Sequence, residues 1–220
     1  MTAALLANAV TEAADWLSEI SANWWFLVVI GVIAFLDSIV PVVPSETTVI
    51  IGGVAAGLGE QPLLAVIACG ALGAFLGDNA AYLVGRGMSG FIERRAERRP
   101  KWKANLAWAS RQIRERGGLL LITARFIPGG RTALTISSGV THQPRGWFAG
   151  WIAVATVIWA SYAALLGYFG GRTFQDNHTL AFLVAFGAAL GVTVLIEAVR
   201  HLARRHAPQV DTEATSQPLP

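Results

Sequence analysis

The stretch Ala124-Arg125-Phe126-Ile127-Pro128-Gly129-Gly130-Arg131 decides how this chain folds, because it places two arginines and a Pro-Gly-Gly break inside an apolar run. A guanidinium at the centre of a bilayer costs about 2.5–3.5 kcal/mol. The break also leaves backbone N–H and C=O groups unpaired where no water can bind them, unless protein or a wet cavity surrounds it. The stretch therefore predicts a membrane protein with a polar site at this break.

The composition points the same way. The chain has 220 residues, of which 54% are hydrophobic and 14% are charged, whereas soluble domains average about 25% charged residues. Its length fits one membrane domain and no additional soluble one. The single cysteine, Cys69, excludes a disulfide within the chain and a cysteine-based metal site. The first residues lack the basic start of a signal peptide, so we expect the N-terminus to be retained.

We predict an all-α polytopic membrane protein with two re-entrant hairpins, about three full transmembrane helices and amphipathic helices at the interface. The expected order is an amphipathic helix 1–23, a membrane domain 24–200 and a basic, then disordered tail 201–220. The membrane domain comprises hairpin 24–58, span 62–85, basic interfacial segment 86–116, hairpin 117–140, and spans 147–169 and 180–199.

The first hairpin rests on length. Trp24–Leu36 makes about 20 Å of helix, which is too short for a hydrocarbon core of about 30 Å. The alternative for residues 24–58 is one span, Trp24–Val43, followed by a half-helix. The two alternatives place the N-terminus on opposite membrane faces, so its side stays open.

The basic residues set the topology. Residues 1–85 contain no Lys or Arg, whereas ten of the chain's seventeen lie between Arg86 and Arg116. Between membrane segments, such a stretch is typical of a cytoplasmic interfacial helix and not of nucleic-acid binding. With this segment and the tail on one side, the two hairpins enter from opposite faces. That arrangement is typical of inverted-repeat transporters, although the halves share no residue-level similarity.

Five ionisable residues are expected at membrane depth: Asp37, Glu46, Asp78, Arg125 and Arg131. Unpaired, they would cost roughly 12–17 kcal/mol in total, so they must pair or face a cavity. Three acids and two arginines approach neutrality if one acid holds a proton, which a buried acid beside other acids does more readily. Arginine also suits bidentate contact with phosphate.

Two opposed hairpin tips would therefore meet in a polar pocket. The tip residues are Pro41, Pro44, Ser45, Pro128, Gly129 and Gly130, and Ser45 is placed to cap the following helix. The alternative is a purely structural salt-bridge cluster, for which Asp37 and Asp78 are the first candidates. The four histidines lie near predicted boundaries without metal-ligand spacing, so we expect no metal and no cofactor.

Three segments carry a resemblance to a known family. They are Phe35-Leu36-Asp37 with Pro41, Pro44-Ser45-Glu46 and Gly52-Gly53; Gly77-Asp78 with Tyr82, Gly85-Arg86 and Gly90; and Arg125-Phe126-Ile127-Pro128-Gly129-Gly130-Arg131. Together they resemble the DedA family of bacterial inner-membrane proteins, which is related to the VTT-domain lipid scramblases of eukaryotes. Asp37 stands where many members have Glu, and Ser45 stands where Gly is common.

The resemblance implies a role in membrane homeostasis. For some members it implies translocation of undecaprenyl phosphate driven by the proton motive force, without enzymatic chemistry. Asp37 and Glu46 match essential acids, which with Asp78 would couple protons, and Arg125 and Arg131 match essential arginines, which would bind phosphate. The expected location is the bacterial inner membrane, with segment 86–116 and the C-terminus cytoplasmic.

Three other functions compete with a flippase for a polyprenyl-phosphate lipid. One is a proton-coupled exchanger of small ions or solutes that uses the same acids. Another is an intramembrane lipid phosphatase, which is disfavoured because no histidine lies near the predicted tips. The last is a structural membrane protein, which would survive replacement of all the buried charges. The substrate, the direction of transport and a homo-oligomeric state stay open.

The topology gives a first prediction. A cysteine introduced near Lys103 should react slowly with a membrane-impermeant thiol reagent in intact cells, because segment 86–116 is expected to face the cytoplasm. Rapid labelling there would invert the predicted topology.

Overall fold

The computed structural model of the chain describes residues 12, 16, 19–40, 45–97, 111, 113, 117–125 and 130–173. The chain divides into two compact units, Met1–Ala189 and Leu190–Pro220, and every described residue lies in the first. Within the described residues all regular structure is helical. The helices are α2 (Trp25–Ile39), α3 (Ser45–Gly57), α4 (Leu63–Gly87), α5 (Ser89–Glu97), α7 (Leu119–Ala124), α8 (Gly130–Val140) and α9 (Arg145–Thr173).

Among the described helices, two are long and apolar enough to cross a membrane. They are α4, with 25 residues, and α9, with 29 residues, each with a mean hydropathy of 1.7. They correspond to the predicted spans 62–85 and 147–169. The predicted span 180–199 and tail lie outside the described residues, as do most of helix 1–23 and most of segment 86–116.

The two predicted hairpins each contain two short helices. In the first, α2 has 15 residues and α3 has 13, so neither reaches across a hydrocarbon core of about 30 Å. In the second, α7 has six residues and α8 has 11. The chain therefore breaks where the prolines and glycines predict, while the return of each pair to the same membrane face stays a prediction.

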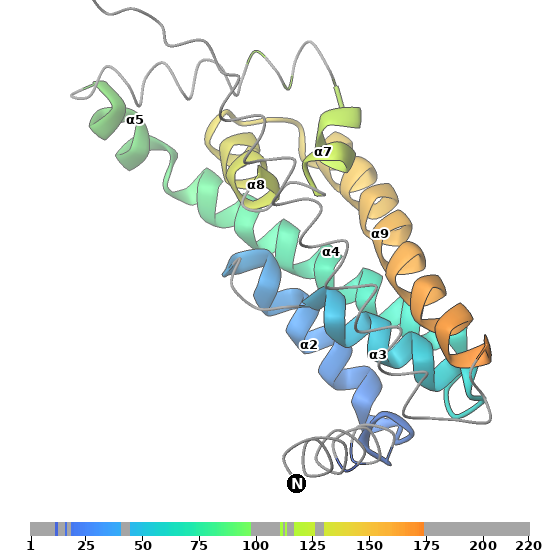
Figure 1. The fold of residues 1–220 in the computed structure, drawn as a ribbon. Helices are drawn as coiled ribbons and strands as arrows, with labels where there is room; N and C mark the ends of the chain where they lie inside the picture. The colour runs from blue at the N-terminus through green and yellow to red at the C-terminus, as the bar shows by residue number, and fades with distance from the viewer. Residues whose placement is uncertain are drawn as a thin grey trace, which may run out of the picture. The chain divides into compact units, whose positions relative to one another are not determined.

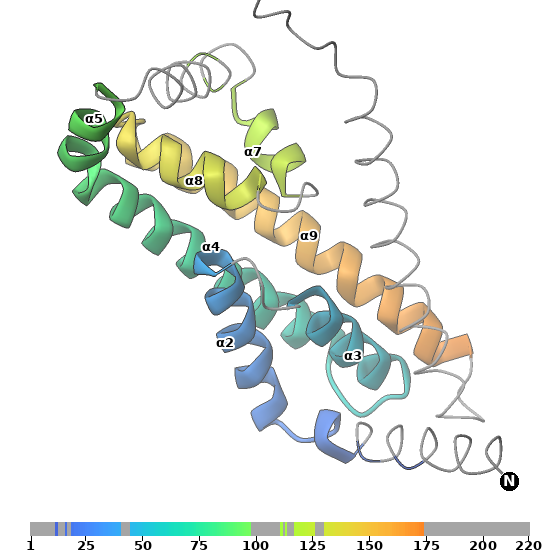
Figure 2. The same ribbon diagram turned by 60° about the vertical axis from the view of Figure 1, so that its left-hand side comes forward.

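The second helix of each predicted hairpin packs on the long helix of the other half of the chain. Helix α3 packs mainly on α9, and α8 packs mainly on α4, while α2 also packs along α4. Figures 1 and 2 show α3 beside the C-terminal half of α9. Both long helices therefore depend on segments from both halves.

Glycines let these helices approach at the backbone. A Cβ on Gly53 of α3 would lie 2.3 Å from the carbonyl oxygen of Ala164, and one on Gly73 of α4 would lie 2.1 Å from that of Gly31. Such contacts are closer than any side chain allows, so these positions accept only glycine. The packing role that the Gly73-xxx-Gly77 spacing predicts is thereby confirmed.

The turn between α8 and α9 is fixed to α4. The Tyr82 hydroxyl donates to the carbonyl oxygen of Gln143 at 2.6 Å and accepts a hydrogen bond from Arg86 at 2.8 Å. The Tyr82 ring stacks on Phe148, with 4.5 Å between ring centroids. These contacts fix the turn after α8 and the start of α9 to α4, and α8 itself also packs closely on α4, where Gly139 meets the carbonyl oxygen of Tyr82.

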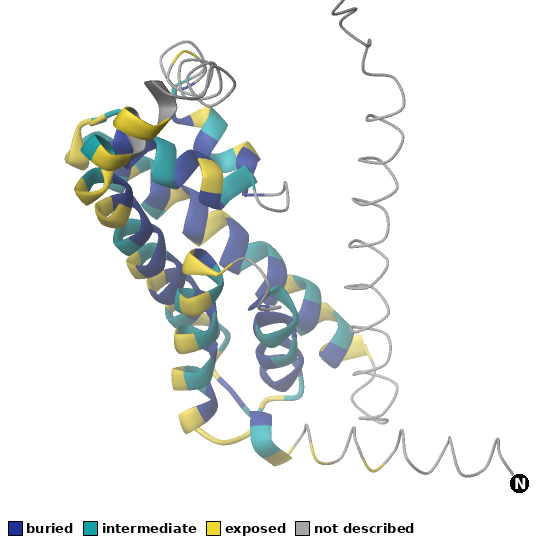
Figure 3. Ribbon diagram, turned by 90° about the vertical axis from the view of Figure 1, so that its left-hand side faces the viewer, coloured by how far each residue is buried: buried dark blue, intermediate teal, exposed yellow. Residues whose placement is uncertain are grey.

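The outward faces of α2 and α4 suit lipid. Large apolar side chains are exposed along both helices, among them Val28, Val32, Leu72 and Leu76. Figure 3 shows this contrast, with exposed positions on the outer faces and buried positions where helices meet. In water such a surface would aggregate, whereas in a bilayer it meets hydrocarbon.

The glycine contacts give a second prediction. Gly167→Ala should lower the free energy of unfolding by about 1–3 kcal/mol through overpacking, because its Cβ would lie 2.1 Å from the carbonyl oxygen of Ile50. The matched control is Gly150→Ala in the same helix, because a Cβ added there would meet no atom within 4 Å. Thermal unfolding of both variants in detergent measures the difference, and equal stability would contradict the packing assignment.

Candidate functional site

Asp78 is the centre of the candidate site. It lies in the C-terminal half of α4, and its side chain is fully buried. The end of α2 is fixed beside it, because the Ser38 hydroxyl lies within hydrogen-bond distance of the carbonyl oxygens of Ala34 and Ala74. Asp37 precedes Ser38, so this packing brings a second carboxylate close to the first.

Arg125 is the first partner of Asp78. It follows directly after α7, and its Nη1 donates to Oδ2 of Asp78 at 2.5 Å. The side chains are 1% and 0% exposed, so this ion pair is shielded from solvent. The guanidinium carbon also lies 5.1 Å from the ring centroid of Trp159 in α9, and a ring face stabilises such a cation further. Arg125 is thus held by both long helices.

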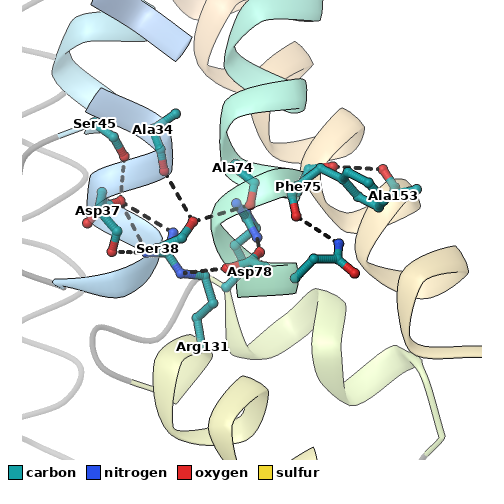
Figure 4. A network of polar contacts seen from close by, with 12 residues as sticks. Ala34, Asp37, Ser38, Ser45, Ala74, Phe75, Asp78, Arg131 and Ala153 are labelled. Atoms are coloured by element: carbon teal, nitrogen blue, oxygen red, sulfur yellow. Dashed lines mark hydrogen bonds and ion pairs between the residues drawn. The ribbon is translucent and has the colours of Figure 1, made fainter. Parts of the chain in front are cut away.

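Arg131 joins the two acids. Its Nη2 donates to the backbone oxygen of Asp37 at 2.5 Å, and its Nη1 donates to Oδ2 of the same residue at 3.3 Å. Its Nε lies 3.7 Å from Oδ1 of Asp78. The Ser45 hydroxyl, at the start of α3, donates to Oδ2 of Asp37 at 2.5 Å. Figure 4 shows Asp37, Ser45, Asp78 and Arg131 pointing toward one another.

These contacts balance the buried charge. We call Asp37, Asp78, Arg125 and Arg131 the charge cluster; it contains two carboxylates and two guanidiniums, so it is formally neutral. Pairing is what makes such burial tolerable, since an isolated charge in the membrane interior would be far more costly. The acids and arginines thus pair with one another in the structure, while their meeting at two hairpin tips stays a prediction.

Some buried polar atoms in this region have no hydrogen-bond partner among the described residues. They are Nε and Nη2 of Arg125, Nε of Arg131, Oδ1 of Asp78, and the hydroxyls of Thr132 and Thr135. Buried donors are usually satisfied. The unsatisfied donors of the two arginines are therefore available to an acceptor such as water or a ligand oxygen.

Glu46 stands apart from the charge cluster. It is the second residue of α3 and is half-buried, and no ion pair or hydrogen bond joins its carboxylate to another described residue. It is nevertheless close enough to Asp37 and Tyr162 to interact with them electrostatically. Of Asp37, Glu46 and Asp78, Glu46 is thus the acid that makes no ion pair with a described arginine.

Asp37 and Asp78 are counter-ions of the arginines, and the Ser45 hydroxyl donates to the carboxylate of Asp37. The predicted roles in proton coupling and phosphate binding stay predictions. Gly130 begins α8. Pro41, Pro44, Pro128 and Gly129 lie outside the described residues, as do three of the four histidines. No group of three or more His, Cys, Asp or Glu in the described ranges is placed to hold a metal ion.

Sequence reasoning missed the contribution of α9. Trp159 contacts Arg125 and Tyr162 lies near Glu46, yet the pattern of the apolar segment indicates only packing or interface anchoring for such aromatic residues. The available signal is their spacing, because residues three apart share one face of a helix.

Comparison with known proteins places this site in a family. A family model described as the VTT domain matches residues 40–169, which is more than half of the chain. An uncharacterized membrane protein of Mycobacterium tuberculosis (strain ATCC 25618 / H37Rv) is 30% identical over 189 residues, which cover 83% of each chain. Protein DedA of Escherichia coli (strain K12) is 23% identical over 195 residues, or 84% of this chain and 88% of that protein.

This chain belongs to the DedA family. A further relative is undecaprenyl phosphate transporter A of Bacillus subtilis (strain 168), with 24% identity over 143 residues, or 64% of this chain and 72% of that protein. No solved structure matches the chain. Since several relatives are named as membrane proteins and α4 and α9 suit a bilayer, this DedA protein is a membrane protein.

The matched VTT range of this DedA protein includes most of the site. Residues 40–169 contain Glu46, Asp78, Arg125, Arg131 and Trp159. Asp37 precedes the range by three residues, yet it is bound to Arg131 within the range. The charge cluster therefore extends to the end of α2.

The central position of Asp78 gives a third prediction. Asp78→Asn should lower the free energy of unfolding by about 3–5 kcal/mol, because it leaves buried guanidiniums without their carboxylate. Glu46→Gln is the matched control, since Glu46 makes no ion pair with a described residue. Thermal unfolding in detergent should separate the two variants clearly. If Asp78→Asn were as stable as Glu46→Gln, Asp78 would not be the counter-ion that anchors the site.

Proposed function

We propose that this protein moves an anionic lipid carrier, such as undecaprenyl phosphate, between the two leaflets of the bacterial inner membrane, driven by the proton motive force. The observation that carries the proposal is the buried pair of arginines in the charge cluster, both placed among membrane-embedded helices. The name of the Bacillus subtilis relative supports the choice of lipid.

The arginines supply what a phosphate headgroup lacks in a bilayer. Carrying a phosphate across hydrocarbon requires that its charge be compensated on the way. A guanidinium keeps its charge and binds phosphate oxygens in a bidentate manner. The carboxylates of Asp37 and Asp78 compete for the same donors. A transported phosphate would therefore either displace a carboxylate or use donors that the carboxylates leave free, and the arginines would never be left unpaired.

Glu46 is our candidate for the proton carrier. The charge cluster is neutral without it, so a charged Glu46 adds one negative charge beside Asp37. An arriving phosphate adds further negative charge. A proton on Glu46 would offset part of that charge, and its loss would favour release of the phosphate. Proton uptake and lipid binding would thereby be coupled through electrostatics alone.

A proton-coupled exchanger of small ions is the second candidate, because the same neutral cluster with one additional acid would serve it. We also infer that segment 86–116 and the C-terminus face the cytoplasm, since the basic residues concentrate there. The two candidates differ in the substrate that moves. A transport assay must therefore follow both lipid and ion.

Reconstitution tests the proposal. The purified protein in vesicles should accelerate the movement of undecaprenyl phosphate between leaflets, and a pH gradient should increase the rate. There are two controls. One is vesicles without the protein, and the other is the same protein vesicles with phosphatidylcholine as the lipid whose movement is measured. No acceleration with folded protein would reject the flippase, and proton-coupled ion flux without lipid movement would select the exchanger.

The role of Glu46 gives a fourth prediction. Glu46→Gln should remove the dependence of lipid movement on the pH gradient, because glutamine cannot exchange a proton. The exposed acid Glu19 provides the matched control, and Glu19→Gln should retain the full dependence. An unchanged response in Glu46→Gln would assign proton coupling to another group.

A further inference from the structure

The two arginines of the charge cluster use their donors differently. In Arg125 only Nη1 is bonded, to Asp78, while Nε and Nη2 have no partner among the described residues. Nε and Nη2 point along the same edge of a guanidinium, which is the edge that binds an oxyanion with two parallel hydrogen bonds. The side chain is 1% exposed. Arg125 therefore presents an intact bidentate edge in a buried position.

Arg131 has no such free edge. Both of its terminal nitrogens bind Asp37, and its Nε lies against the carboxylate of Asp78. To bind a phosphate through two parallel hydrogen bonds, Arg131 would first have to release Asp37. Arg125 can bind one while it keeps its bond to Asp78.

Arg125 is also held more firmly by its surroundings than Arg131 is. Arg125 is fixed by Asp78 of α4 and by the ring of Trp159 in α9. The Asp37–Arg131 pair is the more exposed part of the charge cluster, at 16% and 11%. Helix α8 is held firmly on α4, whereas it meets α2 at few positions. The Asp37–Arg131 pair is therefore a principal link between the end of α2 and the start of α8.

Helix dipoles weaken that link. Asp37 lies in the last turn of α2, where the partial negative charge of the helix end opposes a carboxylate. Arg131 is the second residue of α8, where the partial positive charge opposes a guanidinium. Each residue is placed unfavourably with respect to its own helix. The pair is accordingly easier to open than the pair of Asp78 with Arg125.

We propose that Arg125 is the phosphate-binding residue, through its Nε/Nη2 edge, and that Arg131 is a latch on Asp37 whose opening admits the phosphate. This division of labour rests on the proposed function. It identifies the ligand chemistry as a phosphate oxyanion, supplied by a lipid headgroup or by free phosphate.

Binding measurements test whether Arg125 is the phosphate-binding residue. The protein in phosphatidylcholine nanodiscs would be titrated with undecaprenyl phosphate, with undecaprenol and with inorganic phosphate. Arg125→Lys keeps a charge opposite Asp78 but has no bidentate edge. We expect it to weaken the binding of undecaprenyl phosphate by about 10- to 100-fold, the equivalent of one charge-assisted hydrogen bond. Arg131→Lys should weaken the binding less than Arg125→Lys does, because it leaves the Nε/Nη2 edge of Arg125 intact.

A thiol probe tests the latch. Ser45 is 3% exposed and is bonded to Asp37, so a cysteine there reports whether the Asp37 side of the cluster is open. With Ser45→Cys in a Cys69→Ala background, a water-soluble maleimide should react slowly. Adding Arg131→Lys should accelerate the reaction, because lysine cannot bridge Asp37 and Asp78. Adding Arg125→Lys should leave the rate unchanged, and this comparison separates an opened latch from general unfolding.

The outcomes are distinguishable. Wild-type binding of undecaprenyl phosphate and of inorganic phosphate, but not of undecaprenol, supports a phosphate site, and the relative affinities identify the lipid or the free anion as its ligand. If only Arg131→Lys loses binding, or if the thiol rates of the two lysine variants are equal, the division of labour is wrong while the proposed function stands. If the wild-type protein binds no phosphate compound, both are overturned.

Discussion

The neutralisation of Asp78 is the constraint on which the rest of the site depends. Its carboxylate is fully buried and accepts Arg125 on one oxygen while Arg131 lies against the other. Neither arginine could stay buried among these apolar helices without a carboxylate. Because α4 carries Asp78, the residues that follow α7 and begin α8 are drawn to α4, and Asp37 closes the cluster from α2. The helices must therefore be arranged in this way for the buried charges to be neutralised.

Much of this was predictable from the sequence. Long apolar segments identify α4 and α9, and the Pro and Gly breaks identify the short helices between them, because proline removes a backbone donor and glycine favours helix ends. The pairing of the acids with the arginines also follows from the cost of burying charge. The limits of α7 do not follow, since its six residues are too few for a helical period to define.

The individual partners could not be predicted. Five ionisable residues allow several pairings, and only the packing of α2 on α4 decides that Asp37 meets Arg131 and that Glu46 stays unpaired among the described residues. Trp159 gives no sign of its role, because tryptophan in an apolar helix ordinarily packs or anchors at the interface. Which nitrogen of a guanidinium forms a hydrogen bond depends on small differences in the distances between atoms. No sequence pattern predicts such differences.

The sequence separation of the charge pairs has a consequence for biosynthesis. Asp78 precedes Arg125 by 47 residues, and Asp37 precedes Arg131 by 94. At about 5–20 residues per second, the ribosome needs roughly 5–20 s to add the later partner of Asp37. During that interval Asp37 lacks its partner Arg131, so its acid must be kept neutral, hydrated or shielded at the insertion site. The late arrival of the arginines then completes a membrane domain whose first half cannot be finished before its second half is made.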